Sequence, residues 1–307
     1  MNDPIVKEIL HKVADLDGRP EGAFNLRVNG QSIGRANSSG VTITPKMDGT
    51  GIDIHVKPGT KDEKVHIPVV VSGSGFTDIV TNDFYIGENC SGILIVAGCG
   101  IHNTGCHTSR HDGIHRFHIG RNASVVYKET HYGSGEAEGG RVLNPVTDIF
   151  LERGASFEME SAQIEGVDST HRVTRGVLAA ESTLVVTERL LTTGSQSART
   201  EFALDLDGKG CSAHLISRSV AKGNSSQEFI SRMTGKNDCT GRSECDAIIM
   251  DNAVVKAIPE IIAAHTDASL VHEAAIGKIA GEQLVKLMTL GLTEEESEAQ
   301  IVNGFLK

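Results

Sequence analysis

The sequence predicts a mainly β protein, in which short strands wind into a parallel β-helix between α-helical segments at the two ends. Variants of one motif recur through the middle of the chain, and no helical periodicity separates them. Hydrophobic residues make up 39% of the chain, yet aromatic residues only 4%, with no Trp. A repeat of roughly 20–50 residues is typical of a solenoid, and narrow coils suit Val, Ile, Leu and Ala.

The repeat is clearest from Ile119 to Glu129, where an apolar anchor, a polar corner and an alternating strand follow one another. Its anchors at 86, 119, 151, 178 and 206 lie 33, 32, 27 and 28 residues apart. Gly and Asn in the corner tolerate positive φ, and alternation indicates a half-buried strand. An echo at Lys222 suggests two corners per repeat. A β-sandwich or jelly roll is the alternative, since its turns have similar spacing.

The N-terminal segment, residues 1–20, is predicted to contain an amphipathic helix over residues 3–16. Asp3 can cap this helix and Pro4 fits its first turn, and we expect the helix to plug one end of the solenoid. The β-helix core is assigned to residues 21–275. Early strands are expected at 41–44 and 52–56, and the last coil at 258–263 and 270–274.

A C-terminal helical segment is assigned to residues 276–307. Helical spacing of apolar residues begins at about Ile276 and ends at Gly291. Thr293 and Glu296 have the spacing of a capping box and are expected to open a second helix that ends near Gly304.

Composition limits the class of protein. Lys and Arg number 29 against 40 Asp and Glu, giving a net charge of −11, which argues against nucleic acid or an anionic membrane as partner. No apolar run is long enough to span a bilayer, and the first residues lack a signal-peptide pattern, so we expect a cytoplasmic protein. Six cysteines in such a chain are expected to be thiols or metal ligands. No Walker A motif occurs, so we expect no nucleotide hydrolysis by this chain.

A stretch from Cys99 to His118 is rich in cysteine and histidine, both good ligands for Zn or Fe. One alternative function is therefore a metal-dependent enzyme that uses this stretch, although the spacing fits neither a zinc finger nor a HExxH helix. Another is a β-helix polysaccharide lyase or hydrolase. The lack of Trp and the presence of only three Tyr argue against a sugar-binding platform.

An ordered series of motifs in the C-terminal third resembles the SufB/SufD family, the scaffold subunits of the SUF iron–sulfur cluster assembly machinery. The motifs are Cys245-Asp-Ala-Ile-Ile, Val271-His-Glu-Ala, Gly277-Lys-Ile-Ala-Gly-Glu-Gln-Leu, Gly291-Leu-Thr-Glu-Glu-Glu and Ile301-Val-Asn-Gly-Phe. The resemblance covers roughly residues 20 to 307. It is greatest to the compact SufB-like proteins of anaerobic and archaeal systems.

The resemblance implies a right-handed parallel β-helix that acts as a scaffold and is not itself an enzyme. It implies that residues 276–307 dock a SufC-like ABC ATPase, that two chains form a homodimer through their β-helix cores, and that apo iron–sulfur client proteins receive the product. The cargo would be a transient [4Fe-4S] or [2Fe-2S] cluster. Cys245 and Glu273 match residues of the family's motifs, and His272 belongs to the same motif as Glu273.

Cluster chemistry is consistent with these residues. Iron–sulfur clusters need thiolates, and a weaker oxygen ligand on one iron eases transfer to a client. Cys245 and Glu273 would supply one ligand of each kind. Cys239, six residues before Cys245, and Cys211, about one coil earlier, are further candidate ligands; the alternative for each is a small buried hydrophobic residue.

Overall fold

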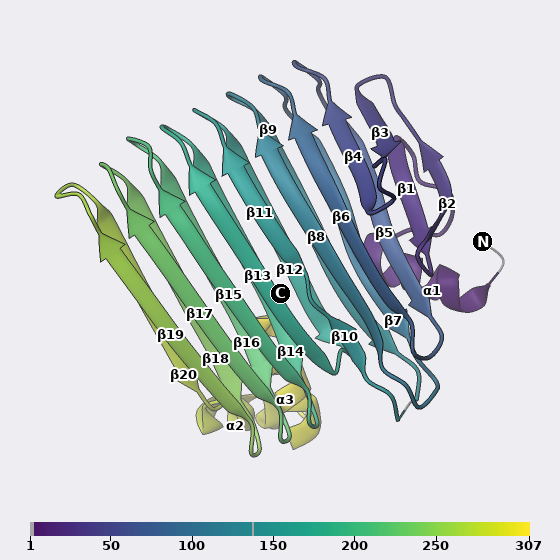
Figure 1. Cartoon of the computed structure of the whole chain (residues 1–307). Helices are drawn as coiled ribbons and strands as arrows, with labels where there is room; N and C mark the ends of the chain where they lie inside the picture. The colour runs from purple at the N-terminus through teal and green to yellow at the C-terminus, as the bar shows by residue number, and fades with distance from the viewer. Residues whose placement is uncertain (1–2, 137) are drawn as a thin grey trace.

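Two ten-stranded sheets face each other in a parallel β-solenoid of about eight turns (Figure 1). The computed structural model describes residues 3–136 and 138–307, and 57% of the chain is strand and 11% helix. The predicted β-solenoid is confirmed. The β-sandwich alternative is wrong, because successive coils pair in parallel and in register, as from Ser169↔Ser197 to Leu178↔Leu206.

Most coils contribute one strand to each sheet. Sheet A contains, in spatial order, β2 (Gln31–Ala36), β1 (Ala23–Val28), β5 (Lys64–Ser72), β7 (Ile93–His102), β9 (Ser124–Ser134), β12 (Ser156–Glu165), β14 (Thr183–Thr192), β16 (Ser212–Ala221), β18 (Thr240–Ile249) and β20 (Ser269–Gly277). Sheet B contains, in spatial order from the same end, β3 (Val41–Pro45), β4 (Gly51–Val56), β6 (Thr77–Ile86), β8 (Ser109–Ile119), β10 (Arg141–Leu143) with β11 (Val146–Leu151), β13 (Ser169–Leu178), β15 (Ser197–Leu206), β17 (Ser226–Gly235) and β19 (Val254–Ala263).

The repeated motif marks the corner where the chain passes from sheet B to sheet A. Ile119 ends β8, and the next strand begins at Ser124. Between them Asn122 has a φ of 54°, and Gly154 at the equivalent corner has a φ of 71°. These left-handed conformations explain the Asn and Gly in the motif. Gly223, with a φ of 76°, lies at the opposite corner, so the two corners per repeat are also confirmed.

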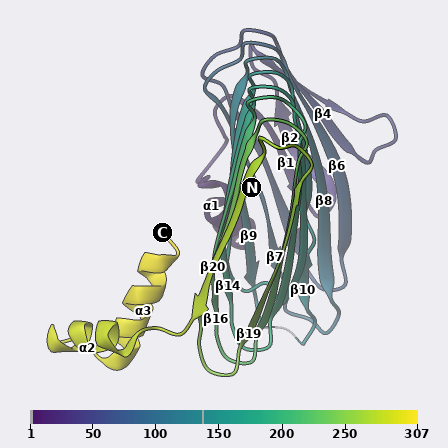
Figure 2. The ribbon, with the colours of Figure 1, turned by 90° about the vertical axis from the view of Figure 1, so that its left-hand side faces the viewer.

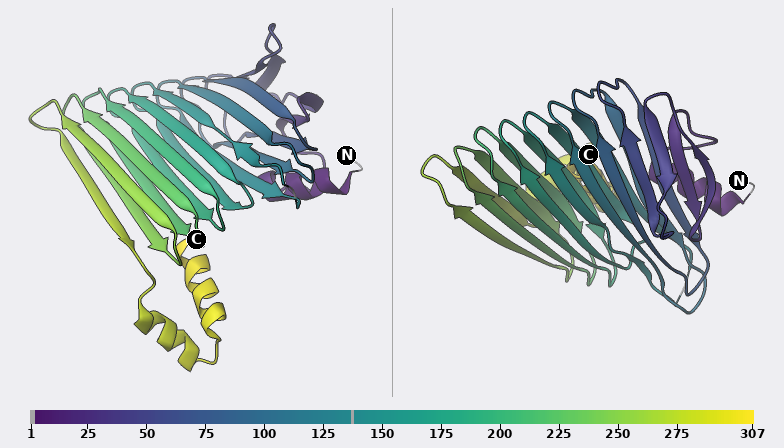
Figure 3. Two further views of the ribbon diagram at one scale, coloured as in Figure 1. Left: turned by 60° about the horizontal axis from the view of Figure 1, so that its bottom comes forward. Right: turned by 45° about the horizontal axis from the view of Figure 1, so that its top comes forward.

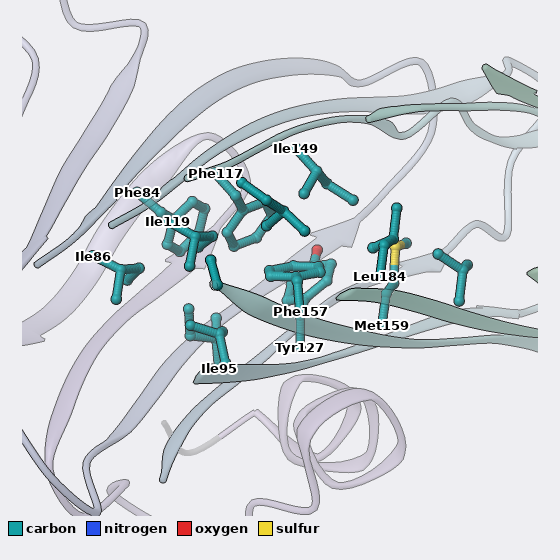
Figure 4. Packing of buried hydrophobic residues seen from close by; sticks show 14 of the residues in the cluster. Phe84, Ile86, Ile95, Phe117, Ile119, Tyr127, Ile149, Phe157, Met159 and Leu184 are labelled. Atoms are coloured by element: carbon teal, nitrogen blue, oxygen red, sulfur yellow. The ribbon is translucent and has the colours of Figure 1, made fainter. Parts of the chain in front are cut away.

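Inward side chains alternate with outward ones along each strand, and the inward rows of the two sheets form the core. The earlier coils hold most of the aromatic side chains of that core (Figure 4). Phe84 and Phe117 stack with centroids 4.2 Å apart, and Tyr127 and Phe157 pack against Phe117. Later coils are filled mainly by smaller aliphatic side chains, as the low aromatic content predicts.

The N-terminal helix α1 (Pro4–Ala14) does not plug the solenoid, so that expectation is wrong. It lies on the outer face of sheet A, against β5, β7 and β9 (Figure 2). Ile9 packs over Gly100, where a Cβ would lie only 2.2 Å from the Ile9 methyl carbon. The end of the solenoid is instead occupied by the antiparallel pairs β1–β2 and β3–β4, which give the first strands their partners. The predicted Asp3 cap is present.

The C-terminal helices are α2 (Gly281–Thr289) and α3 (Glu294–Phe305). Thr293 and Glu296 form the predicted capping box. The first helix starts later than predicted, because Ile276 still pairs with Ala247 as part of β20. The two helices form a hairpin that stands off from the sheet A side of the solenoid (Figures 2 and 3). Among the described residues, no helix has the length and apolar character to cross a membrane.

Candidate functional site

Cys245 points into the solenoid from β18 and is only 1% exposed. Its in-register neighbours on sheet A are Ser217 on β16 and Ala274 on β20. Burial, together with the carboxylates of Glu188 and Asp246, raises the pKa of the Cys245 thiol to about 12. The free thiol is therefore protonated at neutral pH, and iron binding must displace its proton.

His272 is the candidate ligand on β20 that faces the same side of sheet A as Cys245. It pairs with Ser243, which is buried and bonds across the core to Ser231, so His272 faces the interior as Cys245 does. His272 lies on the strand next to Cys245, and its position is shifted along that strand by two residues. Their Cα atoms are therefore about 8 Å apart. The Nδ1 atom of His272 is buried without a hydrogen-bond partner among the described residues. Burial lowers the pKa of His272, which favours the neutral, metal-binding form.

Glu273 lies on the opposite face of the same sheet. It pairs in register with Glu244, and its Oε2 atom accepts a hydrogen bond of 2.7 Å from Arg242 Nη2 on the outer surface. Its side chain is 57% exposed. Within one chain, therefore, Cys245 and Glu273 point to opposite sides of sheet A and do not form the expected thiolate–carboxylate pair.

Cys211 and Cys239 are buried at the corners that precede β16 and β18. Six extended residues separate Cys239 from Cys245, a distance of about 20 Å along the strand. The structure brings Cys211 and Cys239 together with each other, one coil apart, and not with Cys245. Burial, followed by the neighbouring Cys239, raises the pKa of Cys211 to about 11.

The stretch from Cys99 to His118 is divided between the interior and the surface by strand alternation. His111 and His115 point inward, where their Nδ1 atoms bond to Asp78 at 3.1 Å and to Tyr127 at 2.7 Å. His118 lies outside, stacked on two aromatic rings. Among the side chains that the structure describes, no three of His, Cys, Asp or Glu are arranged to hold a metal ion. The metal-enzyme alternative thus lacks a preformed ligand set among the described side chains.

A row of buried polar residues on the inner face of sheet A was not predicted from the sequence. Glu129, Ser161, Glu188, Ser217 and Cys245 occupy equivalent inward positions on β9, β12, β14, β16 and β18. The signal was present, because strand alternation puts Glu129 on the same face as the core residue Tyr127. The row therefore leads from the middle of the solenoid to the candidate site.

Arg172, which projects from β13 on the other sheet, holds this row together. Its guanidinium donates to Glu129 at 2.7 Å and to His131 at 3.0 Å, and it lies 3.4 Å from Glu188. Burial disfavours the Glu129 carboxylate, but His131 and Arg172 outweigh it and lower the pKa of Glu129 to about 2. Glu188 also accepts hydrogen bonds of 3.0 Å from Thr200 and Ser217.

The sequence matches the family described as "SUF system FeS cluster assembly, SufBD core domain", over residues 109–245 and 191–305. These residues include Cys245, His272, Glu273 and both C-terminal helices.

Several archaeal proteins named "Iron-sulfur cluster assembly SufBD family protein" are similar to the chain. The protein of Methanothermobacter thermautotrophicus strain Delta H is 27% identical over 264 residues, which are 83% of this chain and 62% of the relative. The protein of Archaeoglobus fulgidus is 26% identical over 230 residues, 74% of this chain and 60% of the relative. The chain thus spans about three fifths of the length of these relatives.

Proposed function

Because this chain belongs to the SufBD core family, we propose that it is a scaffold on which an iron–sulfur cluster is assembled and from which the cluster passes to apo client proteins. The cluster is cargo, and no catalysis by this chain is needed. The observation that carries the proposal is the placement of Cys245, a family-motif thiol, on the same inner face as the unpartnered Nδ1 atom of His272.

The donors fit a temporary cluster. A thiolate from Cys245 and an imidazole nitrogen from His272 are both iron ligands, and the imidazole is the weaker donor to a cluster. Two ligands leave most iron positions of a cluster to other donors, such as a second copy or small thiols. A cluster held in this way is easier to release than one held by four cysteines.

A second copy of the chain would stand at the C-terminal end of the solenoid. β19 and β20 are the outer edges of the two sheets, and their outward strand edges have no partner within the described residues. Ile261, Ile262 and Val271 on these strands are exposed. Long edges with apolar side chains invite uncontrolled pairing unless they are covered. A two-fold dimer through this end would bring two Cys245 sites close together, and Glu273 would reach a cluster only at such an interface.

The helix pair α2–α3 is the proposed docking element for a SufC-like ABC ATPase. No residue of α2 is buried, and Val285 and Met288 are 60% and 43% exposed. The helix α3 lies against the solenoid, through contacts such as Lys222 Nζ to Glu298 Oε2 at 3.9 Å. An unpartnered apolar face on a projecting helix is suited to a protein partner. A nucleotide-driven movement of that partner could then be passed to the last coils.

Anaerobic reconstitution with iron and sulfide tests the scaffold proposal. The unmodified chain should bind iron and sulfide and develop broad visible absorption. Cys245→Ser should lose most of both, while Cys90→Ser, a buried cysteine at a distant corner, should keep them. Equal iron content and equal spectra for Cys245→Ser and the unmodified chain would show that the site has been misplaced.

A further inference from the structure

Cys211 and Cys239 belong to one row of small residues that lines the same corner in successive coils. The amide of Thr240 donates to the Cys211 carbonyl at 3.1 Å, and the amide of Ser269 donates to the Cys239 carbonyl at 2.9 Å. Equivalent hydrogen bonds between neighbouring coils place Ser182 in the row one coil before Cys211, and Ala268 one coil after Cys239. Cys211 and Cys239 are therefore direct neighbours, one coil apart, and each has a residue without a thiol on its other side.

The separation of the two coils suits a disulfide. Stacked strands lie about 4.8 Å apart, and the Cα atoms of bridged cysteines usually lie about 4.4–6.8 Å apart. Gly235 leaves space beside the Cys239 sulfur, since a Cβ at Gly235 would lie only 3.0 Å from it. Both thiols are buried, yet each follows an exposed corner residue, Gly210 or Asp238. Small fluctuations of these corners would admit a small oxidant.

We propose that Cys211 and Cys239 form a redox-active dithiol that closes into a cross-coil disulfide. Two S–H bonds break and one Sγ–Sγ bond forms, while two electrons and two protons pass to an oxidant. With hydrogen peroxide the oxidant is reduced to two molecules of water. The disulfide links the β15–β16 corner to the β17–β18 corner and so restrains the coil that carries Cys245. The Cys211–Cys239 dithiol is separate from the candidate cluster site, and the formation of its disulfide does not depend on the proposed function.

The test uses the folded 307-residue chain without reconstituted iron. After treatment with hydrogen peroxide, free thiols are alkylated, the chain is digested, and linked peptides are identified by mass spectrometry. We expect a link between the peptides that contain Cys211 and Cys239, reversed by dithiothreitol. Amide hydrogen exchange in β17 and β18 should slow at least about tenfold, because the closed loop restricts opening.

The row supplies matched controls. Cys211→Ser and Cys239→Ser should each abolish the link and leave the other thiol open to alkylation once the chain is unfolded. Serine already occupies the row at Ser182, so these substitutions fit. Cys90 lies in the same row next to Ala123 and should form no link within the chain. The proposal is overturned if Cys211 and Cys239 stay reduced while exposed Cys106 is oxidised, if the link needs urea to form, or if exchange is unchanged by it.

Discussion

Replacement of Arg172 by Met should be among the most damaging single changes in the interior. Arg172 is 4% exposed, and it is the guanidinium that contacts the two buried carboxylates of Glu129 and Glu188. Met replaces the aliphatic part of the Arg side chain and lacks the charged guanidinium, so both carboxylates lose their ionic partner. Removal of one partner of a buried ion pair costs about 3–5 kcal/mol. Glu188 keeps its hydrogen bonds from two hydroxyl groups, so the lower part of that range is expected.

Arg175→Met is the matched control for this prediction. Arg175 lies three residues along the same strand, faces outward with 55% of its side chain exposed, and pairs with Asp148 at 2.7 Å. An exposed pair of this kind contributes about 0–1 kcal/mol. Both variants remove a guanidinium from β13, and they differ mainly in burial.

Urea unfolding at pH 7, followed by far-UV circular dichroism, measures the difference in the free energy of unfolding. Because coils of a solenoid can unfold separately, hydrogen exchange in β13 and β14 should be measured beside it. The added variant Arg172→Met/Glu129→Gln should recover part of the loss, since it removes one unpaired charge. If Arg172→Met lowers the free energy of unfolding no more than Arg175→Met does, the buried ion pairs of Arg172 do not contribute to stability as proposed.

Three further outcomes are expected. The pKa of Glu129 is lowered from an ordinary 4.5 to about 2, so its contribution to stability is complete above pH 4.5 and is lost as the pH falls toward 2. The free energy of unfolding should fall by roughly 3 kcal/mol at most over this range. An acid titration of Arg172→Met should show a much smaller fall. A chain ending at Lys278 should keep the circular dichroism spectrum of the solenoid but lose binding to a SufC-like ATPase in a pull-down; full binding by that folded, shortened chain would refute docking on α2 and α3. Light scattering should give a mass near twice 32.6 kDa, and Ile262→Lys on β19 should shift this mass toward that of the monomer. An unmodified chain that is monomeric both alone and with the ATPase would exclude the dimer.

The corners of the solenoid could be predicted from sequence because they depend on local chemistry. Asn122 and Gly154 occupy left-handed conformations that few other residues adopt, and the following strands alternate regularly. The capping box at Thr293 is local in the same way. The site of α1 could not be predicted, because its apolar face fits either the end of the solenoid or the outer face of sheet A. Only the tertiary fold shows that Gly100 leaves room for Ile9.

The candidate site was predictable only in part, for reasons of register. The motifs identify Cys245 and Glu273, but the side of the sheet that each faces depends on how β18 pairs with β20. The observed register matches Glu244 with Glu273 and turns the carboxylate outward; a shift of one residue would turn it inward. The contact of Arg172 with Glu129 joins two sheets across the core, and no local pattern in the sequence encodes it.

Transfer of a cluster to an apo acceptor protein measures directly whether this chain acts as a scaffold. The reconstituted chain, freed of unbound iron and sulfide, is mixed anaerobically with an apoferredoxin, and the acceptor is separated and measured by its visible spectrum and iron content. If the chain is a scaffold, the acceptor should gain its cluster faster than it does from equal amounts of free iron and sulfide. Transfer should continue when an iron chelator is present, and Cys245→Ser should support none. Transfer no faster than from the free ions, or equal transfer from Cys245→Ser, would show that the chain is not a scaffold built on Cys245.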